Sequence, residues 1–317
     1  MIMMQNENNG ALGFRSGFVA LVGRPNVGKS TLTNALLGEK ISIVTPKAQT
    51  TRTRIHGILN RDAYQMVLVD TPGFCGSETP LRRVLRKLAG TAPADSDLTL
   101  IVTEITGDKP ELSKVDLEII DAARRGPGRV VLAINKIDRI KQKELLLPWI
   151  EHYVAETDLE AVIPISAKFE DGLDVLESQL VKLLPEGPAL FPDDMHTDQI
   201  ERKMCEELIR EQLLFQTHKE VPHSAAVVIE SFEDGRDGGD GMCRLQGRII
   251  VERDSQKAIV IGNKGARIKA VSTASRAAIE ELLGAKVFLR MEVAVDKEWT
   301  KHEASLRRYG LVEETEG

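Results

Sequence analysis

The sequence predicts a doubly wound α/β domain with a mostly parallel sheet, followed by a smaller α+β domain. Three observations support this prediction. Short apolar runs alternate with helical patterns up to residue 184, a glycine-rich stretch joins the first run to a helix, and prolines and glycines interrupt the pattern at 185–192. Runs that are apolar on both faces are typical of parallel strands, which are buried because helices cover both faces of their sheet.

The expected strands of the first domain are short. They are FVALV (18–22), QMVLVD (65–70), LTLIVTEI (98–105), RVVLAINK (129–136) and AVIPISA (161–167). Between them lie segments with apolar residues at helical spacing, such as 112–125 and 171–184. Ligands of doubly wound sheets bind at the carboxyl ends of the strands. The motifs at those ends are therefore the candidates for chemistry.

The stretch GRPNVGKS follows the first expected strand directly. Its glycines allow the backbone N–H groups to surround an anion, and the next helix presents its positive end. We expect Lys29 to reach the β- and γ-phosphates and the Ser30 hydroxyl to ligate Mg²⁺. The alternative is a glycine-rich turn without a ligand. The expected nucleotide contacts in this stretch are Gly23, Arg24, Pro25, Asn26, Val27, Gly28, Lys29, Ser30 and Thr31.

Three further motifs end later strands. In DTPG, Asp70 can hold Mg²⁺ through water and the Gly73 N–H can contact a γ-phosphate. In NKID, the Asp138 carboxylate can accept hydrogen bonds from N1–H and the 2-amino group of guanine, which adenine does not present. SAK would direct an N–H at the guanine carbonyl. The four motifs together predict GTP as the ligand. Their expected contacts are Asp70, Thr71, Pro72, Gly73, Asn135, Lys136, Asp138, Ser166, Ala167 and Lys168.

These motifs, in this order, resemble those of the translation-factor-like GTPases, which convert GTP to GDP and phosphate. Phe74 follows DTPG where Ras-type enzymes have a glutamine that orients water. The resemblance implies that Asn26 helps to bind K⁺, and the alternative is that Asn26 only caps the helix. We expect slow intrinsic hydrolysis, with a catalytic set of Lys29, Asn26, Thr51 and Gly73.

A mobile threonine that closes over Mg²⁺ is expected in KAQTTRTRI. Thr51 matches the family pattern best, and Thr50 is the alternative. The segment is polar and lacks a strand pattern, as an order–disorder switch should. Its basic residues are equally compatible with a solvated loop. The expected Mg²⁺ ligands are Ser30, Thr51 and Asp70.

The C-terminal part of the chain carries the opposite net charge from the rest. From Arg244 to Tyr309 there are 14 Lys and Arg against 8 Asp and Glu, a net charge of +6, and the other residues have a net charge of −12. This distribution suggests that a polyanion binds the C-terminal part. The alternative is a solvated helical face.

From residue 198 the expected order of elements is α-β-β-α-α-β, with GNKG between the two later helices. This order resembles a type II KH domain, an RNA-binding module. GRDG (235–238) and GGDG (238–241) also fit G-x-x-G, but they lie among aspartates that would repel phosphate. The alternative for GNKG is an ordinary helix-turn-helix corner. The expected RNA contacts are Gly262, Asn263, Lys264, Gly265, Arg267 and Lys269.

A GTPase domain followed by a type II KH domain resembles the Era family of bacterial ribosome-assembly GTPases. The resemblance implies GTP, GDP and Mg²⁺ as ligands. It also implies a cytoplasmic protein that binds 16S rRNA near its 3′ end and the small ribosomal subunit, and that touches the inner membrane peripherally. A monomer that does not bind DNA is expected. The alternative function is a GTP-gated membrane or stress-signalling switch whose KH-like domain binds protein.

Three departures from the family pattern stand out, and one of them is the atypical segment GFCGSETPLRRVLRKLAG (73–90) after the start of DTPG, where the family's contacts are the least transferable. The chain has IGNKG where the family usually has I-G-K-G-G, and Thr103-Glu104 where it usually has Val-Asp. The expected divisions are a disordered leader at 1–16, a GTPase domain at 17–184, a linker at 185–197, a KH domain at 198–309 and a tail at 310–317.

Composition excludes several classes of protein. Hydrophobic residues make up 42% and charged residues 28%, an ordinary balance for a globular protein. No apolar run approaches the roughly 18 residues of a membrane span, and the N-terminal residues lack the features of a signal or transit peptide. Cys75, Cys205 and Cys243 have no metal-binding spacing, which predicts a reducing cytoplasm.

Overall fold

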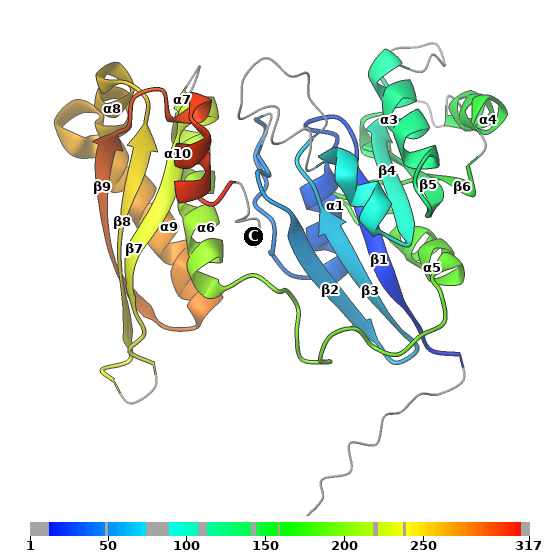
Figure 1. Cartoon of the computed structure of the whole chain (residues 1–317), viewed down its shortest axis with the longest axis horizontal. Helices are drawn as coiled ribbons and strands as arrows, with labels where there is room; N and C mark the ends of the chain where they lie inside the picture. Colours follow the sequence, from blue (N-terminus) through cyan, green and yellow to red (C-terminus); the bar gives the residue numbers. More distant parts are fainter. Residues whose placement is uncertain are drawn as a thin grey trace, which may run out of the picture. The chain divides into compact units, whose positions relative to one another are not determined.

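The computed structural model describes residues 13–47, 50–73, 89–106, 113–140, 144, 146–157, 159–217, 221–236 and 239–311. Within these residues the chain forms two compact units (Figure 1). The first contains residues 13–42, 54–73 and 89–198, and the second contains 43–53 and 199–311. The units differ from the expected divisions in two places. The segment 43–53 belongs to the second unit, and the stretch expected as a linker belongs to the first.

The first unit is built on a six-stranded sheet in the order β2-β3-β1-β4-β5-β6. Its strands are β1 (Arg15–Val22), β2 (Ile55–Arg61), β3 (Tyr64–Asp70), β4 (Leu98–Glu104), β5 (Arg129–Asn135) and β6 (Ala161–Pro164). Only β2 is antiparallel to its neighbour within this sheet. The five strands expected from sequence are confirmed, whereas β2 was not expected.

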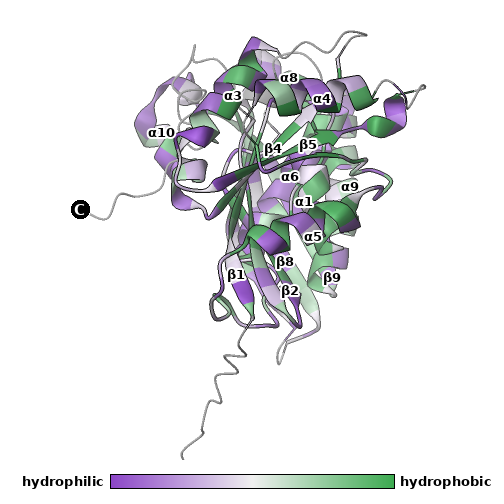
Figure 2. Cartoon of the chain, turned by 90° about the vertical axis from the view of Figure 1, so that its right-hand side faces the viewer, coloured by the Kyte–Doolittle hydropathy of each residue, from purple (hydrophilic) through white to green (hydrophobic). Residues whose placement is uncertain are grey.

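Helices cover both faces of this sheet, which confirms the doubly wound class. Helices α1 (Lys29–Leu37) and α5 (Leu173–Leu183) pack on one face, and α3 (Lys114–Arg124) and α4 (Leu146–Glu156) pack on the other. Two short 3₁₀ turns are also present: η1 (Ala92–Asp95) precedes β4, and η2 (Ile137–Arg139) follows β5. Hydrophilic and hydrophobic residues alternate along α5, as one buried face requires (Figure 2).

The proline-rich stretch after α5 runs along the edge of β2. The backbone N–H of Ile58 donates to the carbonyl of His196 at 2.9 Å, and the Thr197 hydroxyl donates to the carbonyl of His56 at 2.7 Å. The side-chain oxygen of Gln65 accepts from the N–H groups of residues 190 and 191. The first two bonds use backbone groups on the free edge of β2, and the Gln65 bonds add a contact with β3, so the stretch is fixed to the first unit.

The second unit contains a three-stranded sheet in the order β7-β8-β9. The strands are β7 (Ala226–Glu233), β8 (Met242–Val251) and β9 (Lys286–Val295), and the helices packed on one face are α6 (Glu201–Gln216), α8 (Asp254–Ile261) and α9 (Ala266–Leu283). Strand β8 is antiparallel to β7 and parallel to β9. The predicted order α-β-β-α-α-β is confirmed, and a short α7 (Val221–Ser224) precedes β7.

A second small core was not expected from the sequence. It joins β7 and β8 to η5 (Trp299–Lys301) and α10 (Glu303–Arg308), and it centres on the fully buried Trp299. The indole N–H of Trp299 donates to the carbonyl of Ser224 at 2.9 Å. A buried indole needs such a partner. Among the described residues of both units, no helix has the length and apolarity to cross a membrane.

Candidate functional site

The glycine-rich loop connects β1 to α1 at the carboxyl end of the sheet. Gly28 caps α1 in the left-handed region, with φ of 101°, and a Cβ there would lie 2.4 Å from the Asn135 side-chain nitrogen. Lys29 is the first residue of α1 and is buried. Its ammonium donates to the carbonyls of Gly23 and Arg24, both at 3.2 Å. The loop is therefore wrapped around its own lysine, in the position expected for a phosphate cradle.

Asn135 joins three of the four motifs. Its side-chain nitrogen donates to the carbonyl of Val27 in the glycine-rich loop at 2.8 Å. Its side-chain oxygen accepts from the backbone N–H groups of Lys136, at 2.8 Å, and Ala167, at 2.9 Å. Because a buried amide must satisfy both of its ends, these bonds fix the relative positions of the loop, NKID and SAK.

The guanine-reading candidates lie together. The Ser166 hydroxyl donates to the Asp138 carboxylate at 2.6 Å, which orients one carboxylate oxygen. Lys136 has a left-handed backbone, with φ of 65°, and its ammonium donates to the carbonyl of Asn26 at 2.5 Å. These contacts bring NKID, SAK and the glycine-rich loop together, and the Asp138 carboxylate is bound to the serine of SAK. Lys168 instead lies over the Phe169 ring, 4.8 Å from its centroid.

DTPG lies beside the glycine-rich loop. Asp70 is fully buried and pairs in register with Leu21, near the end of β1, and the Thr71 hydroxyl donates to the Leu21 carbonyl at 2.6 Å. A Cβ at Gly73 would lie 2.8 Å from the Cα of Pro25. The backbone cradle and the buried carboxylate fit a nucleotide with a Mg²⁺ ion, whose preferred ligands are oxygens. Phe74 and residues 75–88 lie outside the described part of the chain.

Arg24 makes contacts other than those expected. Its guanidinium donates to the Asp116 carboxylate on α3 at 3.0 Å and lies 3.5 Å from the Thr103 hydroxyl. It also donates to the carbonyl of Glu104 at 3.3 Å. The side chain therefore ties the loop to α3 and β4, while its backbone remains in the cradle. Nothing in the local sequence around Arg24 indicates Asp116 as its partner.

Thr51 belongs to the second unit, and its side chain is buried. The segment 43–53 lies against α6. The Val44 N–H donates to the Glu211 carboxylate at 3.0 Å, and the Lys47 ammonium donates to the carbonyls of Leu214 and Thr217 at the end of that helix. A cation at the last carbonyls of a helix is favourable. Thr50 is hydrogen-bonded to Thr45 within the segment.

Two arginines and a glutamate hold the same segment. The Arg52 guanidinium donates to the carbonyl of Ala225 at 2.7 Å, and Arg210 on α6 donates to the carbonyl of Thr50 and to the Glu207 carboxylate. Burial, and then the Arg210 charge, lower the pKa of Arg52 to about 9, so Arg52 stays charged at neutral pH. Burial acts to raise the pKa of Glu207, but the Arg210 guanidinium outweighs it and the net shift is downward. Two guanidinium groups and one carboxylate therefore lie together where the segment meets α6.

The GNKG turn joins α8 to α9 in the second unit. Residues Asn263 and Lys264 are exposed, and Lys264 has a left-handed backbone with φ of 49°. Lys269, one turn into α9, is also exposed. The Arg267 guanidinium instead donates to the Ile259 carbonyl on α8, so it braces the turn. The two exposed lysines and the backbone of the turn remain the best placed to meet a sugar-phosphate chain.

Apolar side chains lie near this turn. Ile259 on α8 is 37% exposed, although isoleucine is usually buried. Along β9, which contacts both α8 and α9, Leu289, Met291 and Val293 are half-buried. KH-type recognition needs such an apolar surface beside the backbone of the turn for the bases.

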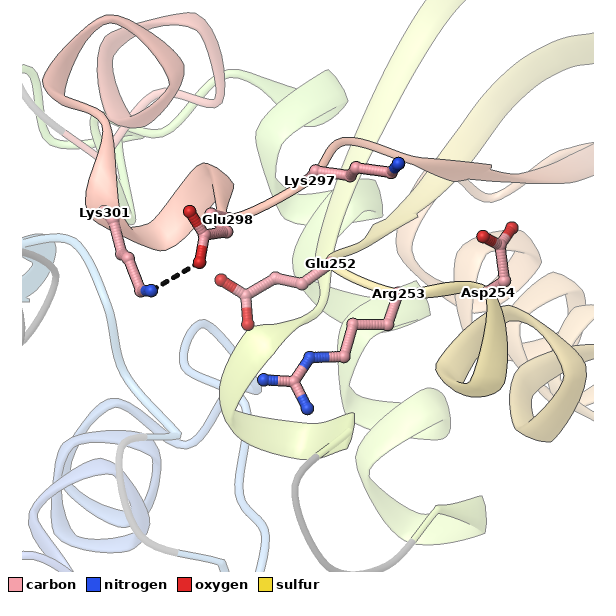
Figure 3. Close-up of a pocket in the computed structure, with 6 residues that line it drawn as sticks. All are labelled: Glu252, Arg253, Asp254, Lys297, Glu298 and Lys301. Atoms are coloured by element: carbon pink, nitrogen blue, oxygen red, sulfur yellow. Dashed lines mark hydrogen bonds and ion pairs between the residues drawn. The ribbon is translucent and has the colours of Figure 1, made fainter.

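A cavity of about 390 Å³ lies at the other end of α8 (Figure 3). Its lining combines Glu252, Arg253 and Asp254 with Lys297, Glu298 and Lys301. Lys301 pairs with Glu298 at 2.5 Å. Three acidic and three basic side chains give the lining no net charge, so it does not favour a phosphate chain. Sequence reasoning missed this cavity because its two halves are about 45 residues apart.

A guanine-reading loop held against a phosphate cradle defines the first unit as a GTPase of the P-loop class, and the G-x-x-G turn between α8 and α9 defines the second as a type II KH domain. Family models give the same division. Residues 18–136 match the 50S ribosome-binding GTPase family, and residues 220–300 match the KH domain.

Whole-chain comparisons are more specific. The chain is 45% identical to GTPase Era of Syntrophus aciditrophicus over 301 residues, which are 95% of this chain and 96% of that protein. It is 44% identical to GTPase Era of Geobacter metallireducens over 297 residues, 94% of this chain and 98% of that one. The chain belongs to the Era family of GTPases.

Solved structures of that family have the same fold. The crystal structure of Aquifex aeolicus Era Y63A bound to GDP and AlF₄⁻ matches with a TM-score of 0.89 at 36% identity, covering 95% of this chain and all of that one. A crystal structure of Era with MgGDPNP and nucleotides 1506–1542 of 16S ribosomal RNA gives the same values. The fold expected from sequence is therefore confirmed over most of the chain.

Proposed function

We propose that this protein hydrolyses GTP with Mg²⁺ and uses the nucleotide to control its hold on 16S rRNA near the 3′ end, during assembly of the small ribosomal subunit. The observation that carries this proposal is that one chain combines an assembled NKID–SAK site with a G-x-x-G turn that carries the exposed Lys264 and has Lys269 and apolar side chains nearby. The Era structure with MgGDPNP and 16S rRNA nucleotides supports it. We propose further that it acts as a monomer in the cytoplasm, with peripheral contact at the inner membrane as an additional expectation.

Each motif then has a defined task. The backbone of 23–28 and Lys29 hold the phosphates, and Asp138 with a backbone N–H of SAK reads guanine. Ser30 and Asp70 hold Mg²⁺, which neutralises charge that develops on the phosphates. Thr51 is proposed to join Mg²⁺ in the GTP state, and it lies in the segment 43–53 that contacts α6.

The contacts of segment 43–53 support a link between nucleotide and RNA. The segment lies in sequence between α1, which begins at the cradle, and β2. It is held by α6, the first helix of the unit that carries GNKG. Because Thr51 lies in the segment that α6 holds, recruitment of Thr51 by the nucleotide is proposed to change the stability of these contacts, and by linkage RNA binding would change the affinity for the nucleotide.

This link predicts different RNA affinities in the two nucleotide states. At fixed salt, the full-length protein should bind the 16S rRNA 3′-end fragment about 5- to 150-fold more tightly in one state than in the other. The measurement compares GDP with a non-hydrolysable GTP analogue. Thr51→Ala and Lys47→Met should both reduce the ratio of the two RNA affinities. Thr51→Ala removes the proposed contact with the nucleotide site, and Lys47→Met removes the contact with α6. Equal affinities in both states would show that the nucleotide acts on ribosomal docking or on another partner.

A second prediction concerns hydrolysis without a glutamine after DTPG. We expect intrinsic turnover on the order of 10⁻⁴ to 10⁻² s⁻¹, faster in K⁺ than in Na⁺. Asn26 lies in the cradle with a left-handed backbone, φ 65°. Asn26→Ala should abolish the difference between the two salts and leave nucleotide affinity largely intact. Equal rates in K⁺ and Na⁺ for the wild type would exclude the K⁺ role and favour a group supplied by a partner.

The alternative, a GTP-gated signalling switch whose KH domain binds protein, makes a different prediction. Crosslinking in cells followed by sequencing of the attached RNA should recover the 3′ end of 16S rRNA if the proposal is correct. Recovery of no enriched RNA, with a protein crosslinked near Lys264 instead, would favour the alternative.

A further inference from the structure

We infer that Glu104 is a positioning residue for guanine-nucleotide binding, acting through Lys136; this inference rests on the proposed function of the first unit. Glu104 is the last residue of β4 and pairs in register with Asn135, the first residue of NKID. Its carboxylate lies 2.8 Å from the Lys136 ammonium, and each side chain is about one-fifth exposed, 21% and 19%. The parallel pairing of β4 and β5 therefore places a carboxylate at the entrance of the base-reading loop.

The Lys136 ammonium has two anchors. It donates to the Asn26 carbonyl in the glycine-rich loop at 2.5 Å, and it forms the ion pair with Glu104. The left-handed backbone at Lys136 further limits the directions its side chain can take. With both ends fixed, the aliphatic stem between them is held in one conformation. Such a stem can cover the apolar face of a purine while the ammonium remains paired.

Other cations converge on the same place. The Arg139 guanidinium lies 3.8 Å from the same Glu104 oxygen, and Arg24 donates to the Glu104 carbonyl. Asp116 is the ion-pair partner of Arg24. Without the Glu104 carboxylate, Lys136 and Arg139 would face each other with their shared counter-charge removed. Repulsion would move the Lys136 ammonium away from the position described above. The Lys136 stem would then cover the guanine base less well, and the affinity for the nucleotide would fall.

The role of Glu104 differs from that of Asp138. Asp138 reads the edge of the base, whereas the Lys136 stem covers its face. Loss of Glu104 should therefore weaken the binding of guanosine diphosphate and of inosine diphosphate equally, because inosine differs from guanosine only by lacking the 2-amino group on the edge of the base. Glu104→Gln removes the charge and nearly preserves the shape. It should raise the dissociation rate of GDP by about 5- to 30-fold. This effect is larger than that expected for loss of an exposed ion pair and smaller than that for a fully buried one.

The test measures dissociation of fluorescent GDP and IDP analogues by stopped flow at low salt. Lys136→Met keeps the stem without the charge, so Glu104→Gln should add no further change in that background. Glu104→Asp, which keeps the charge, should restore most of the wild-type rate. Glu160→Gln, which alters an exposed carboxylate 4.0 Å from Arg129 on the same sheet, is the matched control and should have no effect. The thermal midpoint of each nucleotide-free variant should stay close to that of the wild type.

Three results would overturn the inference. They are an unchanged GDP dissociation rate in Glu104→Gln, an equal effect of this change in the Lys136→Met background, and a loss of GDP affinity that spares IDP. If the wild type itself bound no guanine nucleotide, the proposed function would fail instead, so the two failures are distinguishable.

Discussion

Asp138→Asn is expected to change the nucleotide preference of this protein from GTP to xanthosine triphosphate. The carboxylate accepts hydrogen bonds from two donors on guanine, and an amide would place its own donors against them. A site built around such bonds rejects a mismatched partner by about four orders of magnitude, because the buried polar groups are left without partners. Xanthine carries an oxo group, a hydrogen-bond acceptor, where guanine carries the 2-amino donor. This oxo group can accept a hydrogen bond from the N–H of the new amide.

The measurement is competition between GTP and xanthosine triphosphate for the wild type and the variant. Ser166→Ala is the matched control, because Ser166 only orients the carboxylate through its 2.6 Å hydrogen bond. It should weaken GTP by roughly 1 kcal/mol without a change of preference. Unchanged GTP affinity in Asp138→Asn would show that NKID does not read the base.

Replacing both Asn263 and Lys264 with Asp should nearly abolish binding of the 16S rRNA fragment. The change introduces two negative charges where a phosphate is expected, and like charges in contact cost several kcal/mol, a hundredfold or more in affinity. Loss of the lysine should also reduce the slope of log affinity against log salt by about 1. Both residues are exposed, so the fold should tolerate the change.

The matched control carries the same change in net charge elsewhere. Ser178→Asp with Lys182→Asp lies on the exposed side of α5 in the first unit. This control should weaken RNA binding only slightly, because the added charges act through long-range repulsion that salt screens. GTP affinity should be unchanged in both double variants. If the two double variants weaken RNA equally, GNKG makes no direct contact and the basic surface acts only through its total charge.

The motifs of the GTP site could be predicted because their chemistry is local. A glycine that permits a left-handed turn, a lysine at a helix start and an aspartate at a strand end are each set by neighbouring residues. The buried strands were equally predictable from their apolar runs. Strand β2 was not, because Ile55–Arg61 contains polar residues and a glycine, and it becomes a strand by pairing with β3 and with the stretch near His196.

Helix α4 was not singled out from the sequence. Helix α4 carries Pro148 in its first turn, where a proline removes no hydrogen bond that the helix needs. The core around Trp299 depends on β7, β8 and α10, which are brought together only by folding.

By itself, the sequence determined the two fold classes, the order of elements, the nucleotide motifs and the candidate RNA turn. Only the tertiary structure showed that Asn135 joins three motifs, that Arg24 contacts Asp116, that Glu104 holds Lys136, and that the segment carrying Thr51 packs against α6. The physical reason is the range of the interactions. Backbone conformation and strand burial are determined by residues a few positions apart, whereas ion pairs and side-chain hydrogen bonds between distant segments depend on which elements the fold places side by side.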